Sequence, residues 1–117
     1  MQLEWNKCDG GGWCPLLTVD LNHMHFDDMD GVYIIWHAGN PCRVVYVGQG
    51  IVAARIASHR QNKAITGYAR HGKLLVTWAA VPAAQRDGVE RYLADQWSPL
   101  VGDVHPDARP IAVNSPW

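Results

Sequence analysis

The sequence predicts an α+β fold in which helices flank a small, mainly antiparallel sheet. Three stretches rich in β-branched and aromatic residues favour strands, at residues 31–36, 42–48 and 73–81. An alanine-rich stretch at 51–62 and a periodic stretch at 83–97 are typical of helices. The order β-β-α-β-α therefore predicts a layered α/β/α domain with a central three-stranded sheet.

The connecting segments agree with this order. We expect residues 1–30 to form a loop-rich arm, with at most one short strand, that packs on the body through Trp5, Trp13 and Leu17. The first two strands are joined by His-Ala-Gly-Asn-Pro, a turn sequence that predicts an antiparallel hairpin. Pro82 stands where proline favours the first turn of a helix, and so predicts the start of the second helix.

The composition is that of a folded chain. Of its 117 residues, 48% are hydrophobic and 18% are charged, which excludes a disordered protein. The length fits one domain, 1–117, divided into the arm, a core at 31–102 and an extended, proline-punctuated tail at 103–117. No apolar run approaches the ~20 residues that cross a bilayer, so we expect no membrane partner. The N-terminus lacks the pattern of a signal peptide, which predicts a cytoplasmic protein.

The three cysteines are few and odd in number, which predicts free thiols in a reducing compartment. A zinc site is the alternative for two of them. Cys8 and Cys14 are followed by His23 and His25, although the spacing of the cysteines is wider than that of common zinc motifs.

Charge is unevenly distributed along the chain, although the net charge is only −1. Residues 31–86 hold seven basic and no acidic side chains, whereas residues 1–30 hold six acidic side chains and one basic. A basic face attracts polyanions, and so near-neutral a net charge implies modest non-specific affinity for nucleic acid. The residues that we expect to contact nucleic acid are Gln49, Arg55, Arg60, Lys63, Arg70 and Lys73.

Two tyrosines and a cation pair are candidates for a phosphate site. Tyr33 and Tyr46 each lie close to a glycine of the predicted hairpin, so strand pairing would bring both phenols onto one face. Arg55 and His59 are four residues apart and share a face of the next helix, which begins after a glycine turn whose free amides favour an anion. The alternatives are that the phenols are ordinary half-buried sheet aromatics and that the cations form a solvated helix face.

Glu90 is a further candidate. At ~100° per residue, the second predicted helix places it on an apolar stripe with Leu93 and Trp97. A buried or half-buried carboxylate needs a partner or a metal ion. The alternative is a salt bridge to Arg86 or Arg91 at the edge of the stripe.

Together these residues resemble the GIY-YIG nuclease family. Gly31-Val32-Tyr33 is similar to its first motif and Tyr46-Val47-Gly48 to its second. Arg55 falls at the arginine of the family's helix, His59 at a position that is histidine or tyrosine in relatives, and Glu90 at the metal-binding glutamate. The resemblance covers residues 31–102. It implies the small layered α/β/α fold of that family and an endonuclease that hydrolyses the phosphodiester bonds of DNA with Mg²⁺ or Mn²⁺.

The resemblance also implies a role for each residue. Glu90 would hold a single Mg²⁺ or Mn²⁺ ion, which keeps water ligands and polarises the phosphate. Arg55 would clamp the phosphate oxygens in a bidentate manner. Tyr33 or Tyr46 would orient or deprotonate the attacking water, for which a neighbouring cation must lower the phenol pKa, and His59 would assist.

Two departures from the family pattern favour a second interpretation, a catalytically weakened module that binds nucleic acid. Gln49 stands where many relatives have a lysine, and Gly102 follows a proline-containing segment in which relatives often have an asparagine. A third interpretation is a plain protein-interaction domain whose ends, with Trp5, Trp13 and Trp117, serve a partner. We expect no separate recognition domain, so DNA specificity would come from the core, the arm, a partner protein or a homodimer.

Overall fold

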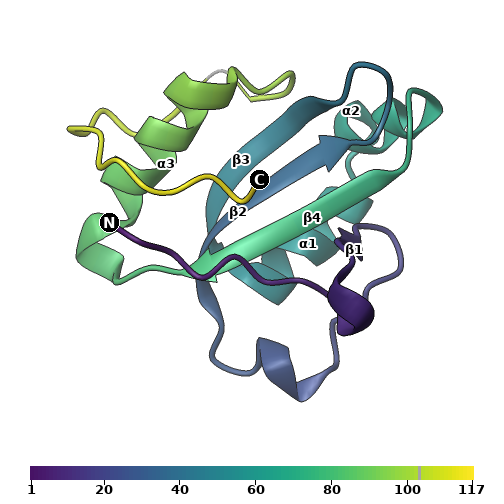
Figure 1. Cartoon of the computed structure of the whole chain (residues 1–117), viewed down its shortest axis with the longest axis horizontal. Coiled ribbons are helices and arrows are strands. Elements are labelled where there is room, and N and C mark those ends of the chain that lie inside the picture. The colour runs from purple at the N-terminus through teal and green to yellow at the C-terminus, as the bar shows by residue number, and fades with distance from the viewer. Residues whose placement is uncertain (103) are drawn as a thin grey trace.

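A four-stranded antiparallel sheet forms the centre of the protein (Figure 1). The computed structural model describes residues 1–102 and 104–117. The strands are β1 (Cys14–Pro15), β2 (Asp30–His37), β3 (Arg43–Ile51) and β4 (Leu74–Ala80), in the spatial order β1-β4-β2-β3. The mixed helix and sheet class is confirmed. The prediction of three strands is wrong, because two residues of the arm add β1 to the outer edge of β4.

Helices cover both faces of this sheet. The helix α1 (Val52–Arg60) lies on one face, and α3 (Ala83–Trp97) lies on the other, as Figure 1 shows. The predicted helix at 51–62 ends earlier than expected, because the side chain of Asn62 accepts a hydrogen bond from the Ala64 amide and so caps a new helix. That helix is α2 (Lys63–Thr66), which continues into the 3₁₀ turn η3 (Gly67–Arg70); two further turns, η1 (Asp9–Gly11) and η2 (Met24–Phe26), lie in the arm.

Alternation along β2 divides the core into two layers. Tyr33 and Ile35 are fully buried on the side of α1, where Ile56 is one of the residues that pack on them. Val32 and Ile34 are fully buried on the side of α3. The central strand is therefore apolar on both faces, and the side chains that it holds in place are fixed from both sides.

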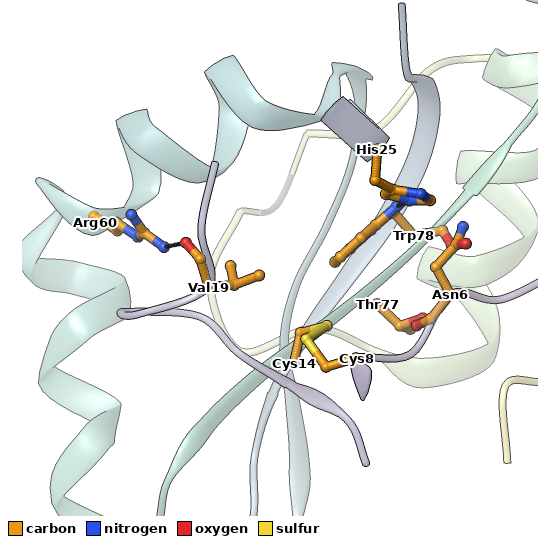
Figure 2. The surroundings of a disulfide bond; sticks show 8 residues. All are labelled: Asn6, Cys8, Cys14, Val19, His25, Arg60, Thr77 and Trp78. Carbon is orange, nitrogen blue, oxygen red and sulfur yellow. Dashed lines mark hydrogen bonds between the residues drawn. A yellow bond between two sulfur atoms is a disulfide. The ribbon is translucent and has the colours of Figure 1, made fainter. Parts of the chain in front are cut away.

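The N-terminal arm is joined to the sheet by a disulfide between Cys8 and Cys14 (Figure 2). The prediction of free thiols is therefore wrong for this pair, whereas Cys42 is free and exposed. The disulfide occupies both sulfurs, which argues against the alternative of zinc bound by these thiolates. In Figure 2, His25 instead accepts a hydrogen bond from the Trp78 indole, with 3.0 Å between Nε2 and Nε1.

The tryptophans near the two ends pack against the domain and against each other. Trp13 meets Trp36 of β2 edge-on at 5.4 Å between ring centroids, and Trp117 stacks on Trp97 of α3 at 5.1 Å. The indole of Trp5 donates a hydrogen bond to a backbone carbonyl of the tail. These contacts partly bury Trp5 and Trp13, whereas Trp117 stays 46% exposed.

Two details of the arm and tail complete the fold. Leu17 is 45% exposed and does not pack on the body as predicted, since the neighbouring Leu16 is the residue that is buried. The tail runs along α3 and reaches the chain start, where Leu3 and Asn114 exchange hydrogen bonds. Within the described part of the chain, none of the helices combines the length and the hydropathy that crossing a bilayer requires.

Candidate active site

The two phenols of the hairpin lie on the same face of the sheet, as the strand pairing predicts. In the ladder between β2 and β3, Tyr33 stands opposite Gly48 and Tyr46 stands opposite Ile35. The two tyrosine rings are stacked, with centroids 6.1 Å apart and an interplanar angle of 16°. The motifs that the sequence singled out are thus neighbours on the α1 side of the sheet.

The helix α1 brings a histidine and an arginine onto these rings. The Tyr33 hydroxyl lies 2.6 Å from Nε2 of His59, and the His59 ring lies 4.5 Å from the Tyr46 ring. One helical turn earlier, Nε of Arg55 donates to the same hydroxyl at 3.4 Å. This hydrogen bond raises the pKa of the Arg55 guanidinium, and an interaction with Tyr46 adds to the effect. Four of the predicted site residues therefore form one contiguous cluster.

Burial sets the protonation of the Tyr33 and His59 pair. Tyr33 is 0% exposed and His59 is 4% exposed. Desolvation raises the pKa of Tyr33 far above its usual value, against the lowering effect of Arg55. Desolvation also lowers the pKa of His59 to about 4, with the charge of Arg55 as the second cause. At neutral pH, Tyr33 therefore keeps its proton and donates a hydrogen bond to Nε2 of the uncharged His59 ring. The lowered phenol pKa that base catalysis demands is not found at Tyr33.

Gly48 makes this cluster sterically feasible. A side chain at this position would overlap the Tyr33 hydroxyl and would place its Cβ 2.9 Å from a ring carbon of Tyr46. The glycine of the second motif is thus explained by the approach of two phenols to the backbone of β3. On the outer side of the cluster, Gly102 lies against Tyr46, since a Cβ added there would come within 3.0 Å of its ring.

Glu90 is buried, with an exposed fraction of 8%, as its place on the apolar stripe of α3 predicts. Its partner is His105 of the tail, at 3.3 Å between Oε2 and Nδ1. The alternative of a salt bridge to a neighbouring arginine is wrong, because Arg86 pairs with Asp30 and Arg91 pairs with Asp95. Desolvation is the main cause of the raised pKa of Tyr33, and the charge of Glu90 is the smallest of its causes. Among the described residues, no hydrogen bond joins Glu90 to the phenol cluster.

The residues expected to contact nucleic acid fall into two groups. Arg60 donates to the Leu16 and Val19 carbonyls at 2.7 Å each and so fastens the arm to α1 (Figure 2 shows the second bond). Gln49 donates to Asp87 of α3 at 2.8 Å. The remaining lysines and arginine of this set are exposed and take part in none of the ion pairs found among the described residues: Lys63, Arg70 and Lys73.

His105 is the site residue that the sequence did not reveal. It belongs to a tail without helical or strand periodicity, and only the return of that tail along α3 brings its ring to Glu90. A histidine followed by proline in an extended segment carries no signal of such a contact. The sequence showed only that an asparagine of the family pattern is missing near Gly102, and it did not point to His105 as a partner of Glu90.

Comparison with protein families, characterised proteins and solved structures finds no significant match for this chain. The GIY-YIG resemblance therefore stays a prediction that rests on the motifs and on the geometry of the cluster.

Proposed function

We propose that this protein is a divalent-metal-dependent endonuclease that hydrolyses phosphodiester bonds of DNA. The observation that carries the proposal is the convergence of two phenols, an arginine and a histidine from separate elements on one hydrogen-bonded cluster. A structural core would gain little from Arg55, whose charge costs free energy when it is partly withdrawn from water. A phosphate, in contrast, would pair with a guanidinium held in this way.

We infer the roles of these residues from the protonation of the cluster. Tyr33 holds its proton firmly and His59 binds one weakly, so neither is a suitable proton acceptor at neutral pH. Tyr46 is more exposed than Tyr33 and interacts with Arg55, the cation that a phenolate would need. We therefore assign Tyr46 to the attacking water, and Tyr33 and His59 to the positioning of Arg55, which would bind the non-bridging phosphate oxygens.

Glu90 suits a single Mg²⁺ or Mn²⁺ ion. Among the described residues, only Oε2 of its carboxylate has a hydrogen-bond partner, which leaves Oε1 for another ligand. No group of three metal-binding side chains occurs there, and Mg²⁺ commonly uses one or two carboxylates with water and substrate phosphate as the other ligands. When bound, the ion would supply charge neutralisation at the phosphate and at the leaving oxygen.

A second candidate is the binding module without turnover, and the bond between Gln49 and Asp87 favours it. A glutamine engaged with α3 supplies no charge at the position where relatives have a lysine. A cytoplasmic location also stays a prediction, and the disulfide between Cys8 and Cys14 argues against it, since such bonds are rare in the cytosol.

A plasmid-nicking assay with titrated Mg²⁺ or Mn²⁺ tests the proposal. We expect metal-dependent nicking by the wild type and a loss of at least about a hundredfold in Arg55→Ala, Glu90→Gln and Tyr46→Phe, as for the removal of one transition-state contact. The matched control is Arg91→Ala, which removes an exposed arginine next to Glu90 and should nick like the wild type. Wild-type rates in the first three variants would contradict the site, and DNA binding without nicking at any metal concentration would favour the binding module.

A further inference from the structure

A hollow lies at the tip of the hairpin, away from the phenol cluster. It is a cavity of about 320 Å³ lined by the hairpin tip, the η3 turn and the segment after α3, and its polar lining includes His37, Asn40, Arg43, Tyr68 and His71. This volume is at the lower end of the range for small-molecule sites and fits one nucleotide-sized group. None of the roles assigned so far involves these side chains.

Three aromatic rings form the wall of this pocket. His37, Tyr68 and His71 lie with their ring centroids 5.5 to 6.2 Å apart, and the interplanar angles run from 9° to 33°. The ring of His37 lies closely against the hairpin loop, since a Cβ added at Gly39 would lie 2.8 Å from its Nδ1. His37 and Tyr68 are nearly parallel, and His71 is inclined to them by 28° and 33°. Because Tyr68 is partly exposed and His71 is exposed, their rings can stack on a base at little entropic cost.

His37 adds a hydrogen-bond donor to this surface. It is 5% exposed, and its Nδ1 accepts a hydrogen bond from the Gly39 amide at 3.1 Å. Desolvation, with the nearby His71 and Arg43, lowers the pKa of His37, so the ring is neutral and its proton lies on Nε2. Within the described residues Nε2 has no hydrogen-bond partner, and no buried polar side-chain atom is left unsatisfied. Nε2 therefore meets the pocket that His37 lines.

One cation lines the pocket, and two more belong to segments next to it in the chain. Arg43 lines it, and the exposed Arg70 and Lys73 belong to the η3 turn and to the segment that hydrogen-bonds the hairpin loop. None of the ion pairs found among the described residues involves these three cations. Stacking rings beside unpaired cations are the combination by which proteins bind single-stranded nucleic acid.

The pocket and the candidate active site are on the same face of the sheet. Tyr33, Ile35 and His37 alternate along β2 and point the same way, so ~13 Å separates the first from the third at 3.3 Å per residue. The chain from Leu100 to Gly102 links the two places along the edge of β3, with Leu100 in the pocket wall and Gly102 against Tyr46. At ~3.4 Å per nucleotide along B-form DNA, this distance is about four nucleotides or fewer.

The geometry points to this pocket as the site of one unpaired nucleotide of the DNA strand that is cut, a few nucleotides from the scissile phosphate. A base inside a duplex has both faces covered by its neighbours and cannot stack on a protein ring, so the occupant must be unpaired. The substrate class is therefore DNA with a single-stranded, frayed or branched region. This inference rests on the proposed nuclease function and names its substrate.

Binding measured without divalent metal separates this inference from catalysis. The probes are a fluorescein-labelled single strand of about 15 nucleotides and the matching blunt duplex, followed by anisotropy in EDTA at low salt. We expect Tyr68→Ala to weaken single-strand binding by ~5- to 100-fold, the effect of losing one stacked base, and to leave duplex binding within about twofold. Tyr68→Phe keeps the ring and should bind the single strand like the wild type.

The control variant is Tyr92→Ala, which removes a half-buried tyrosine of α3 outside the pocket. If Tyr68→Ala does not fold, Arg43→Ala and His71→Ala, which change exposed residues, replace it in the test. We expect each of them to weaken binding of the single strand more than binding of the duplex. Equal binding by all three pocket variants and the wild type would overturn the inference. So would an equal loss in Tyr92→Ala, or a free deoxynucleotide monophosphate that competes as well as the labelled strand does.

The nuclease proposal and the pocket assignment can each fail while the other stands. If the wild type does not nick plasmid with any metal but Tyr68→Ala still loses single-strand binding, the pocket assignment stands and the catalytic proposal does not. If the wild type nicks and the pocket variants bind unchanged, the reverse holds.

Discussion

The buried histidine of the phenol cluster makes the stability of the fold sensitive to acid in a defined pH range. His59 is 4% exposed, lies beside Arg55, and has a pKa lowered from 6.5 to about 4. In the unfolded chain its pKa returns to about 6.5. Between these two values the unfolded state binds a proton that the folded state does not, so acid favours unfolding.

The size of the effect follows from the two pKa values. The contribution of His59 is fully present above about pH 6.5 and is lost as the pH falls towards 4. At about 1.4 kcal/mol per pKa unit, the complete loss is about 3 kcal/mol, and about 2 kcal/mol of it has occurred at pH 5. This is a large part of the ~5–15 kcal/mol that stabilises a typical domain.

The assay is urea unfolding of the wild type and of His59→Gln at several pH values from 7 to 4.5. Glutamine does not titrate and can still pair with the Tyr33 hydroxyl, so it removes the proton equilibrium and keeps the contact. The quantity of interest is the difference between the two free energies of unfolding at each pH. His37, whose pKa is also lowered by burial, is present in both proteins and cancels from this difference.

Between pH 7 and pH 5, we expect the free energy of unfolding to fall by about 2 kcal/mol more in the wild type than in His59→Gln. A difference that does not change with pH would mean that His59 titrates as it does in water. That result would refute the statement that His59 is a buried, uncharged hydrogen-bond acceptor for Tyr33. It would also refute the assignment of these two residues to the positioning of Arg55.

Two further predictions concern the glycine of the second motif and the arm. Gly48→Ala should lower the free energy of unfolding by ~1–3 kcal/mol and reduce nicking sharply, because the added methyl group overlaps the Tyr33 hydroxyl. Urea unfolding midpoints and nicking rates measure these effects. A variant with wild-type values of both would contradict the close approach of Tyr33 to Gly48. Reduction of the bond between Cys8 and Cys14, in a Cys42→Ser background that prevents exchange, should cost ~2 kcal/mol in urea unfolding, because the bond closes a short loop with a sequence separation of 6. Identical midpoints with and without reductant would show that the arm is not fastened by this bond.

The elements that carry the site were predictable from local sequence patterns. The hairpin of β2 and β3 follows from β-branched runs around a Gly-Asn-Pro turn, and pairing then places Tyr33 and Tyr46 on one face. The spacing of four residues in α1 does the same for Arg55 and His59. These are short-range rules, and the structure agrees with each of them.

What could not be predicted depends on contacts between distant parts of the chain. The partner of Glu90 comes from a tail without periodicity, and Arg60 donates hydrogen bonds to carbonyls of the arm. Two residues form β1 only because the arm reaches the outer edge of β4. Burial, which no local pattern reports, also raises the pKa of Tyr33, one of the two phenols that the sequence left as candidates for the base.

The hydrogen bonds between Leu3 and Asn114 join residues that are 111 positions apart, which affects how the chain can reach its folded state. During synthesis, Leu3 leaves the ribosome long before Asn114 does, so the arm cannot complete its contacts until Asn114 has emerged. Closure of so long a loop is entropically costly and is typical of slow folding steps. The order of assembly is thus expected to run from the β2 and β3 hairpin outwards, with the two ends joining last.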